Sequence, residues 1–339
     1  MSKKSTGLSD YRKIKWWLNY LVGPLLFIMI ALSIYRQLHN QPNLDQHWAF
    51  LRKTLVSESS SFILPAIVLI AFNWGLEALK WQQLVKHLMP ISWWKALLGV
   101  LAGVSFTMIT PNRMGEFLGR VLYMPEGSRI KSAVLTAIGS LSQLIITLAA
   151  GLAGLFYMRQ VATSSDQWPP LLTNILLFGT MAVLLAGLVV YFNLGWAIRT
   201  IEKWPPINKY AVFIHALGEI SGRELLKILG IALLRYIVFL VQYWLVFRAL
   251  HLSIDVIPIV AGSATMFLII AIVPTISLAE LGIRSQISLY VFGLFCSDNL
   301  GILLVSGIIW LINIILPAIA GSLIMLSVKL FGKNQVATS

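Results

Sequence analysis

Long uninterrupted runs of apolar residues constrain the fold of this chain more than any other feature. In hydrocarbon, every backbone N–H and C=O must be hydrogen-bonded within the protein, so a run of roughly 20 apolar residues predicts a membrane-spanning helix. Such runs occur near 18–36, 61–80, 132–158, 171–193, 225–250 and 302–328. The sequence therefore predicts an all-α polytopic membrane protein with six full spans.

Composition supports this class and argues against others. Only 12% of the 339 residues are charged and 58% are hydrophobic, whereas soluble domains carry about 25% charged residues. The net charge of +13 does not indicate nucleic-acid binding, because no soluble module presents a basic run. Attraction to anionic lipid headgroups and orientation in the membrane explain it better. The single cysteine, Cys296, and five scattered histidines predict no metal site.

Two further apolar regions, 96–124 and 256–296, are interrupted by polar residues. In each, about 15–18 apolar residues are followed by a polar break and then a shorter apolar arm. Pro111 and Pro274 stand at the breaks, and proline ends a helix. Non-helical backbone at membrane depth is tolerated only against protein or a wet cavity. We expect both regions to be re-entrant helical hairpins.

The distribution of positive charge predicts the orientation. With six spans and two hairpins, both termini lie on the same side, and cytoplasmic segments are enriched in Lys and Arg. The side that holds the termini would carry 17 Lys and Arg residues, Lys80 among them, against five on the other side. We expect cytoplasmic termini and a single membrane domain over 18–330, between a basic leader (1–17) and a tail (331–339).

The same topology predicts an inverted repeat. Region 61–158 with hairpin 96–124 and region 225–328 with hairpin 256–296 have the same order of elements in opposite orientations, joined by the span 171–193. Both breaks also carry Glu-x-x-x-Arg, as Glu116/Arg120 and Glu280/Arg284. In transporters, matching breaks in two oppositely oriented halves indicate a binding site near the bilayer midplane.

Charged residues at membrane depth are the candidate site. Each costs on the order of 2.5–3.5 kcal/mol to insert, so each needs a partner or a function. Guanidinium groups bind phosphate oxygens bidentately, and helix N-termini after the breaks also favour anions. We predict that a phosphate-bearing headgroup is bound by six residues: Arg113, Glu116, Arg120, Arg235, Glu280 and Arg284.

Structural roles remain open for several of these residues. An Arg can pair with the Glu four positions earlier on its helix, Arg235 can pair with a buried carboxylate, and Glu280 can complete a capping box with Ser277. Gly99/Gly103 and Gly115/Gly119 favour close helix packing over ligand contact. The remaining polar residues of the spans are expected to hold helices together; they are Asn73, Glu77, Gln143, Gln242 and Asn313.

The break Pro111-Asn112-Arg113-Met114-Gly115-Glu116 resembles a Pro-x-Arg-x-Gly-Glu signature of the flippase-like membrane domain of the lysylphosphatidylglycerol synthase (multiple peptide resistance factor) family. A second signature of that family, Ser-x-Gly-Gly-x-Gly-x-Arg-Glu, is similar to residues 277–285, with Ala279, Glu280 and Ser285 as departures. The resemblance extends over nearly the whole chain, without the soluble synthase domain. It implies lipid translocation rather than lipid synthesis.

From these observations we expect a transporter that flips a phospholipid or related phosphate-bearing lipid between leaflets. Its partner would be an anionic or zwitterionic lipid of a bacterial plasma membrane. The alternatives are a carrier of polyprenyl-phosphate or a polyprenyl-linked sugar, and a non-transporting accessory subunit of a lipid- or glycan-modifying enzyme. Phosphate-binding loops, nucleophile elbows and metalloprotease motifs are absent from the sequence, so we expect neither an enzyme nor a cofactor. The oligomeric state is open, a homodimer being one option.

Overall fold

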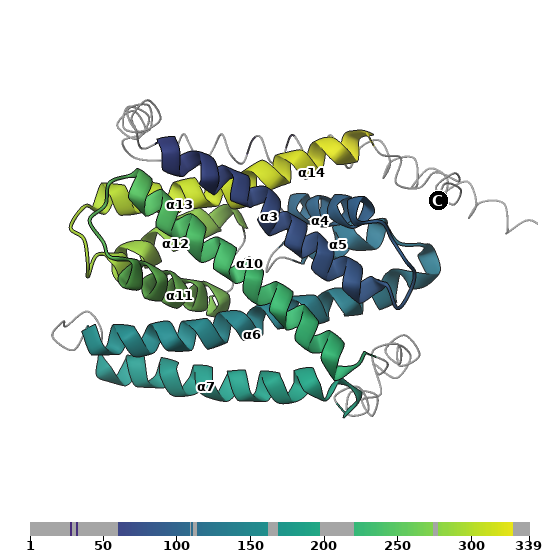
Figure 1. The fold of residues 1–339 in the computed structure, drawn as a ribbon, viewed down its shortest axis with the longest axis horizontal. Helices are drawn as coiled ribbons and strands as arrows, with labels where there is room; N and C mark the ends of the chain where they lie inside the picture. The colour runs from purple at the N-terminus through teal and green to yellow at the C-terminus, as the bar shows by residue number, and fades with distance from the viewer. Residues whose placement is uncertain are drawn as a thin grey trace, which may run out of the picture.

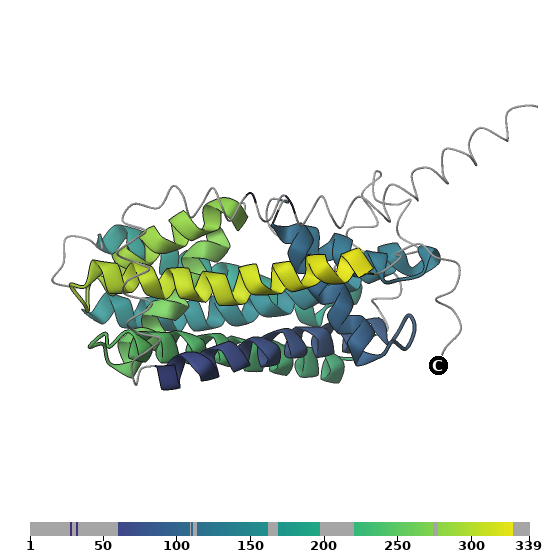
Figure 2. The ribbon, with the colours of Figure 1, turned by 90° about the horizontal axis from the view of Figure 1, so that it is seen from above.

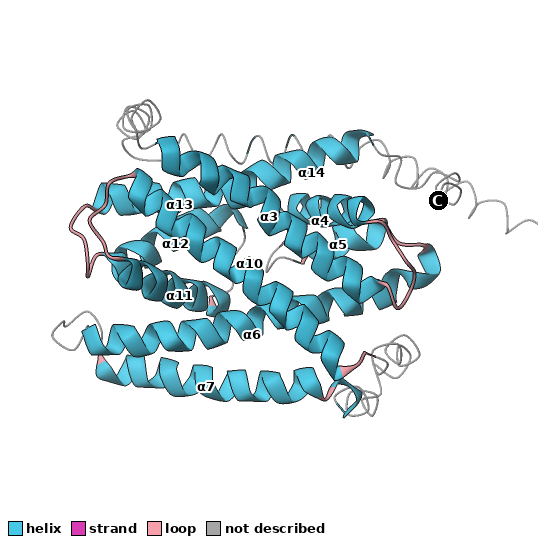
Figure 3. Cartoon of the chain, in the orientation of Figure 1, coloured by secondary structure: helices cyan, strands magenta, loops and turns pink. Residues whose placement is uncertain are grey.

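The computed structural model describes residues 60–108, 110, 114–161, 169–196, 220–273 and 277–327, and the isolated residues 28 and 32. Within these ranges all regular secondary structure is helical (Figure 3). The predicted first span, 18–36, lies almost entirely outside the described residues, as do both chain termini.

Long helices form at five of the predicted spans. They are α3 (Ser60–Val85), α6 (Arg129–Val161), α7 (Pro170–Phe192), α10 (Gly222–Ala249), and α13 (Asn299–Trp310), which continues through a π-helix (Leu311–Ile315) into α14 (Leu316–Ser327). Four stretches in the described ranges are long and apolar enough to cross a membrane: 61–85, 126–161, 170–192 and 299–325. The chain is therefore a multi-pass membrane protein whose described ranges are helical.

The two interrupted regions each form a pair of shorter helices. The pairs are α4 (Trp93–Thr107) with α5 (Gly115–Leu122), and α11 (Val256–Ile272) with α12 (Ser277–Phe292). The helices of each pair contact one another. The expectation of a shorter second arm holds for α5, with 8 residues, but is wrong for α12, whose 16 residues nearly equal the 17 of α11.

The two short pairs lie at opposite ends of the molecule. In Figure 1, α4 and α5 lie toward the right-hand end, and α11 and α12 toward the left-hand end. The view from above shows the same separation along the length of the yellow α13–α14 run, which follows the long axis (Figure 2). The connection from α12 to α13 is at the left end, and that from α3 to α4 is at the right end.

The packing of the two halves has matching partners. If α3, α4, α5 and α6 are matched in order with α10, α11, α12 and α13–α14, most contacts of one half recur in the other. The pair α11·α6 corresponds to α14·α4, α3·α4 to α10·α11, and α5·α6 to α12·α13, while α3 packs directly on α10. A two-fold exchange of the halves thus reproduces the main helix contacts.

Small residues allow the closest of these contacts. A methyl group added at Gly119 of α5 would overlap the backbone of Gly103 on α4, and one added at Gly115 would overlap the α4 backbone at Phe106. This agrees with the expectation that these glycines serve helix packing. On the other face of α4, Ser105 Oγ donates to the carbonyl of Ala318 on α14 at 2.7 Å.

One charge is placed differently from the expectation. Lys80, which the topology argument assigned to a cytoplasmic segment, lies within α3 with 1% of its surface exposed. Its ammonium is buried because it pairs with Glu77, one turn earlier, at 2.8 Å. Lys80 therefore does not count among the Lys and Arg residues on the cytoplasmic side, and it belongs to the buried charged residues instead.

Candidate functional site

Glu77, on α3, is the centre of a buried group of charges. Its Oε1 accepts a hydrogen bond from Arg120 Nη2 on α5 at 2.7 Å. Its Oε2 lies 2.8 Å from Lys80 Nζ and 3.1 Å from Arg235 Nη1 on α10. Glu77 is 3% exposed, so three helices direct cations onto one buried carboxylate.

The periodicity of α3 explains why these groups meet. Asn73, Glu77 and Lys80 are spaced four and three residues apart and so occupy one helical face. Asn73 Oδ1 accepts from Arg235 Nε at 2.7 Å, and its Nδ2 donates to Asn313 Oδ1 at 2.9 Å. The polar face of α3 therefore contacts side chains from α5, from α10 and from the π-helix.

Asn313 belongs to the five-residue π-helix between α13 and α14. Such segments interrupt an α-helix and are frequent at functional sites. Besides accepting from Asn73, Asn313 donates from Nδ2 to the carbonyl of Ile309 at 3.3 Å. The irregular turn thus places an amide, rather than an apolar side chain, against the polar face of α3.

Arg235 is held on several sides. In addition to Glu77 and Asn73, its Nη1 donates to Gln143 Oε1 on α6 at 3.3 Å. The guanidinium also lies over the rings of Trp74 and Phe239, each 5.2 Å from the ring centroid, a geometry that stabilises a cation. The sequence analysis left two roles open for Arg235, headgroup binding and pairing with a buried carboxylate. The structure shows the pairing, with Glu77.

Arg120 is more deeply buried but less fully bonded. It is 1% exposed, and its contacts with Glu77 and Glu116 both use Nη2, at 2.7 and 3.5 Å. Its Nε and Nη1 have no hydrogen-bond partner within the described ranges. An arginine buried in this way normally has its donors satisfied, whereas the described residues provide no acceptor for these two.

Glu116 differs from Glu77 in its surroundings. Its side chain, in the first turn of α5, is 21% exposed, and it reaches Arg120 only at 3.5 Å. We refer to Glu77, Lys80, Glu116, Arg120 and Arg235, with the amides of Asn73, Gln143 and Asn313, as the Glu77 network.

A second buried ion pair belongs to the other half. Arg284 Nη2 donates to Glu280 Oε1 at 2.6 Å, and Nη1 donates to the hydroxyl of Tyr243 on α10 at 3.0 Å. Arg284 is 7% exposed and Glu280 4%. Arg284 therefore does pair with the Glu four positions earlier. The side chain of Ser277, proposed to form a capping box with Glu280, lies outside the described side chains.

The predicted site residues thus fall into three sets. Glu116, Arg120 and Arg235 meet in the Glu77 network, and Glu280 and Arg284 form the second pair. Arg113 lies outside the described residues. The sequence analysis missed the central role of Glu77 and the burial of Lys80, although their i, i+3 spacing beside Asn73 was a usable signal.

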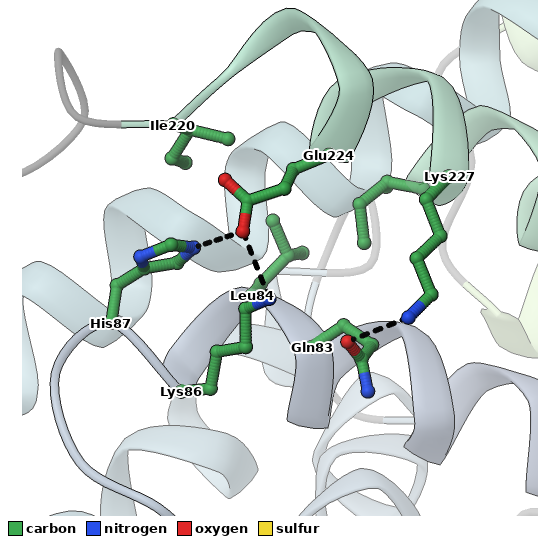
Figure 4. Close-up of a pocket in the computed structure, with 8 residues that line it drawn as sticks. Gln83, Leu84, Lys86, His87, Ile220, Glu224 and Lys227 are labelled. Carbon is green, nitrogen blue, oxygen red and sulfur yellow. Dashed lines mark hydrogen bonds and ion pairs between the residues drawn. The ribbon is translucent and has the colours of Figure 1, made fainter.

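A small surface pocket lies elsewhere, between the end of α3 and the start of α10 (Figure 4). Glu224 Oε1 lies 2.8 Å from Lys86 Nζ and 3.3 Å from His87 Nε2, and Lys227 Nζ donates to Gln83 at 3.2 Å. Hydrogen bonds from Lys86 and from the Ser221 backbone lower the pKa of Glu224 to about 2. This pocket contains none of the predicted site residues, and its ion pairs join the first helices of the two halves.

Comparison with known protein families gives one finding. The profile described as "Lysylphosphatidylglycerol synthase TM region" matches residues 45–321, which include every helix of the Glu77 network and of the Glu280–Arg284 pair. No curated protein matches the chain.

Proposed function

Because the chain belongs to the lysylphosphatidylglycerol synthase TM region family, we propose that it moves a phosphate-bearing lipid headgroup between membrane leaflets. The lipid is an anionic or zwitterionic phospholipid of a bacterial plasma membrane, and the Glu77 network is where its phosphate binds.

The observation that carries this proposal is Arg120. Its guanidinium is 1% exposed, and two of its nitrogen donors lack a partner among the described residues. Charge-assisted hydrogen bonds to phosphate are short and strong, and an arginine matches phosphate geometry better than a lysine. A phosphate oxygen would satisfy donors that otherwise remain buried without an acceptor.

The arrangement of helices supports transport by two opposed halves. We propose that α4–α5 and α11–α12 are re-entrant hairpins entering from opposite membrane faces, within an inverted repeat of six spans and with cytoplasmic termini. Their location at opposite ends of the molecule (Figure 1) and the matching contacts of the two halves favour this topology. Transporters built in this way bind substrate where the breaks of the two halves meet.

We also propose that the chain is not an enzyme. A general base must be able to take up a proton near its substrate, whereas the carboxylates of Glu77 and Glu280 are already engaged by cations at 2.6–3.1 Å. Glu116 alone does not provide the paired acid and base that hydrolysis or group transfer would require.

The test is leaflet exchange by the purified chain. Vesicles containing the protein and a trace of fluorescent phosphatidylglycerol are treated with a membrane-impermeant quencher, which reaches only the outer leaflet. We expect protein-containing vesicles to lose the protected inner-leaflet signal, while protein-free vesicles retain it. An unchanged protected fraction would contradict translocation and favour the accessory-subunit role.

A further inference from the structure

The hydroxyl group of Tyr243, on α10, has only a weak acceptor for its proton among the described residues. Its oxygen accepts a hydrogen bond from Arg284 Nη1 at 3.0 Å, so its own proton needs a separate acceptor. That acceptor is the sulfur of Met266 on α11, at 3.7 Å, and a thioether accepts weakly. The same sulfur also accepts from the Ser288 hydroxyl at 3.1 Å. A fully buried phenol therefore donates only to a distant and shared sulfur atom.

Arg284 adds a second donor beside this hydroxyl. Its Nη1 is bonded to Tyr243 and its Nη2 to Glu280, whereas its Nε has no hydrogen-bond partner within the described ranges. Arg284 is 7% exposed, and buried side-chain donors normally have an acceptor. Two linked donors that lack a strong acceptor indicate the place of an oxygen ligand.

The first half of the chain has a corresponding arrangement. Arg120 on α5 bonds Glu77 on α3 at 2.7 Å and lies 3.5 Å from Glu116, four residues earlier. In each half, therefore, the arginine of the short helix pair contacts the first long helix, and its Nε lacks a partner among the described residues. The contact on the long helix differs: it is a carboxylate in the first half and, in the second, a hydroxyl that can itself donate.

We infer that Arg284 and Tyr243 form a second oxyanion site, separate from the Glu77 network. The ligand accepts hydrogen bonds from Arg284 Nε and from the Tyr243 hydroxyl, and those from a guanidinium to phosphate oxygens are short and strong. Glu280 is a positioning residue, because its 2.6 Å bond to Nη2 orients the guanidinium. The ligand assignment, a lipid phosphate, rests on the proposed function, and the inference adds that each half binds the phosphate by itself.

The test counts the binding sites of the purified, detergent-solubilised chain. Radiolabelled dihexanoyl phosphatidylglycerol is the probe, and its saturable binding is measured per chain. We expect two sites in the wild type. Tyr243→Phe keeps the aromatic ring but removes the donor, so the affinity of one site should fall at least tenfold while the other is unchanged. Arg120→Gln should weaken the other site and leave the Tyr243-dependent site.

Tyr191→Phe and Arg248→Gln are the matched controls. Tyr191 is also fully buried, but its hydroxyl donates to the carbonyl of Leu225 at 3.0 Å. Arg248 is exposed at the end of α10. Both control variants should retain two sites. If Tyr243→Phe does not fold, the number of sites in the wild-type protein decides alone.

Competition identifies the source of the phosphate. Unlabelled dihexanoyl phosphatidylglycerol should displace the probe from the Tyr243-dependent site, and inorganic phosphate at the same concentration should not. Equal displacement by both would assign the oxyanion site to free phosphate and overturn its part in lipid transport.

The outcomes separate this inference from the proposed function. A single site in the wild type, or unchanged binding by a folded Tyr243→Phe protein, would overturn the second site and leave translocation through the Glu77 network intact. Two binding sites without protein-dependent lipid exchange in vesicles would overturn the proposed function and leave the second oxyanion site in place.

Discussion

Glu77 on α3 and Arg120 on α5 are 43 residues apart in the chain, and they form a hydrogen-bonded ion pair of 2.7 Å inside the helix bundle. Both side chains are almost fully buried. The ion pair fixes α5 against α3, the first long helix of the same half. It therefore connects the helix that begins at Gly115 to the buried charges of α3.

Replacing Glu77 by Gln should destabilise the protein strongly. The amide keeps the shape of the side chain but leaves Lys80, Arg120 and Arg235 close together without their shared counter-charge. Breaking a buried ion pair by removing one partner costs about 3–5 kcal/mol. Thermal unfolding in detergent, followed by tryptophan fluorescence, should show a clear fall in Tm.

Glu116→Gln is the matched control for that measurement. Glu116 is partly exposed and contacts Arg120 at 3.5 Å, so its loss should lower Tm far less. If the two variants unfolded at the same temperature, Glu77 would not be the centre of the network.

Gly119→Ala should separate α4 from α5. The added methyl group would overlap backbone atoms of Gly103, which cannot move without shifting a helix, and overpacking of this kind costs about 1–3 kcal/mol. Gly282→Ala in α12 is the control, because a methyl group there meets no atom within 4 Å among the described residues. A lower Tm for Gly119→Ala but not for Gly282→Ala is expected. Equal values would argue against close backbone contact.

Much of the helix architecture could be predicted because the membrane imposes it. Apolar length located α3, α6, α7, α10 and α13–α14, and proline with polar residues located the two breaks. The end of 61–80 was placed too early: α3 continues to Val85. That error assigned Lys80 to the surface, because a lysine after an apolar run is typical of a membrane boundary.

The candidate site was less predictable, for a physical reason. The charged residues of the breaks can be recognised in the sequence because they interrupt apolar runs. Their partners, however, depend on which helices pack together. Arg120 has Glu116 four residues away, yet its shorter contact is with Glu77. The pattern of apolar residues also does not indicate the π-helix that contains Asn313, the partner of Asn73.

The ion pairs at the surface pocket should make stability depend on pH below neutrality. The pKa of Glu224 is lowered to about 2 in the folded protein, against about 4.3 for an unperturbed Glu. A lowered carboxyl pKa stabilises the fold above the unfolded pKa, and this contribution is lost as pH falls through about 4 toward 2. The Tm advantage of wild type over Glu224→Gln should be constant near pH 7 and shrink between pH 5 and pH 3. A Tm difference between wild type and Glu224→Gln that increased as the pH fell from 5 to 3 would contradict this prediction.

Labelling of Cys296 tests the orientation of the two halves. This cysteine is partly exposed in the connection between α12 and α13, which we propose lies outside the cytoplasm. A membrane-impermeant maleimide applied to intact cells should react with it. In a Cys296→Ser background, Gly127→Cys, which is exposed in the short turn of helix directly before α6, should react only after permeabilisation. The reverse pattern would contradict the proposed topology.

Arg113 remains a sequence prediction. It has no acidic residue four positions earlier, so a bound phosphate is its expected partner. Arg113→Ala should slow lipid exchange with little effect on Tm, because its loss removes one charge-assisted contact of about 1.5–3 kcal/mol. An unchanged exchange rate would remove Arg113 from the site.

The most direct test of the central claim is the phosphatidylglycerol exchange rate of Arg120→Gln relative to wild type in reconstituted vesicles. Gln keeps a hydrogen-bonding side chain near Glu77 but lacks the charge and the free guanidinium donors. Arg248→Gln serves as the control for reconstitution, and Tm as the control for folding. If Arg120 binds the phosphate, the folded variant should exchange lipid at least tenfold more slowly than wild type, while Arg248→Gln matches wild type. A folded Arg120→Gln protein that exchanges lipid at the wild-type rate would contradict the account.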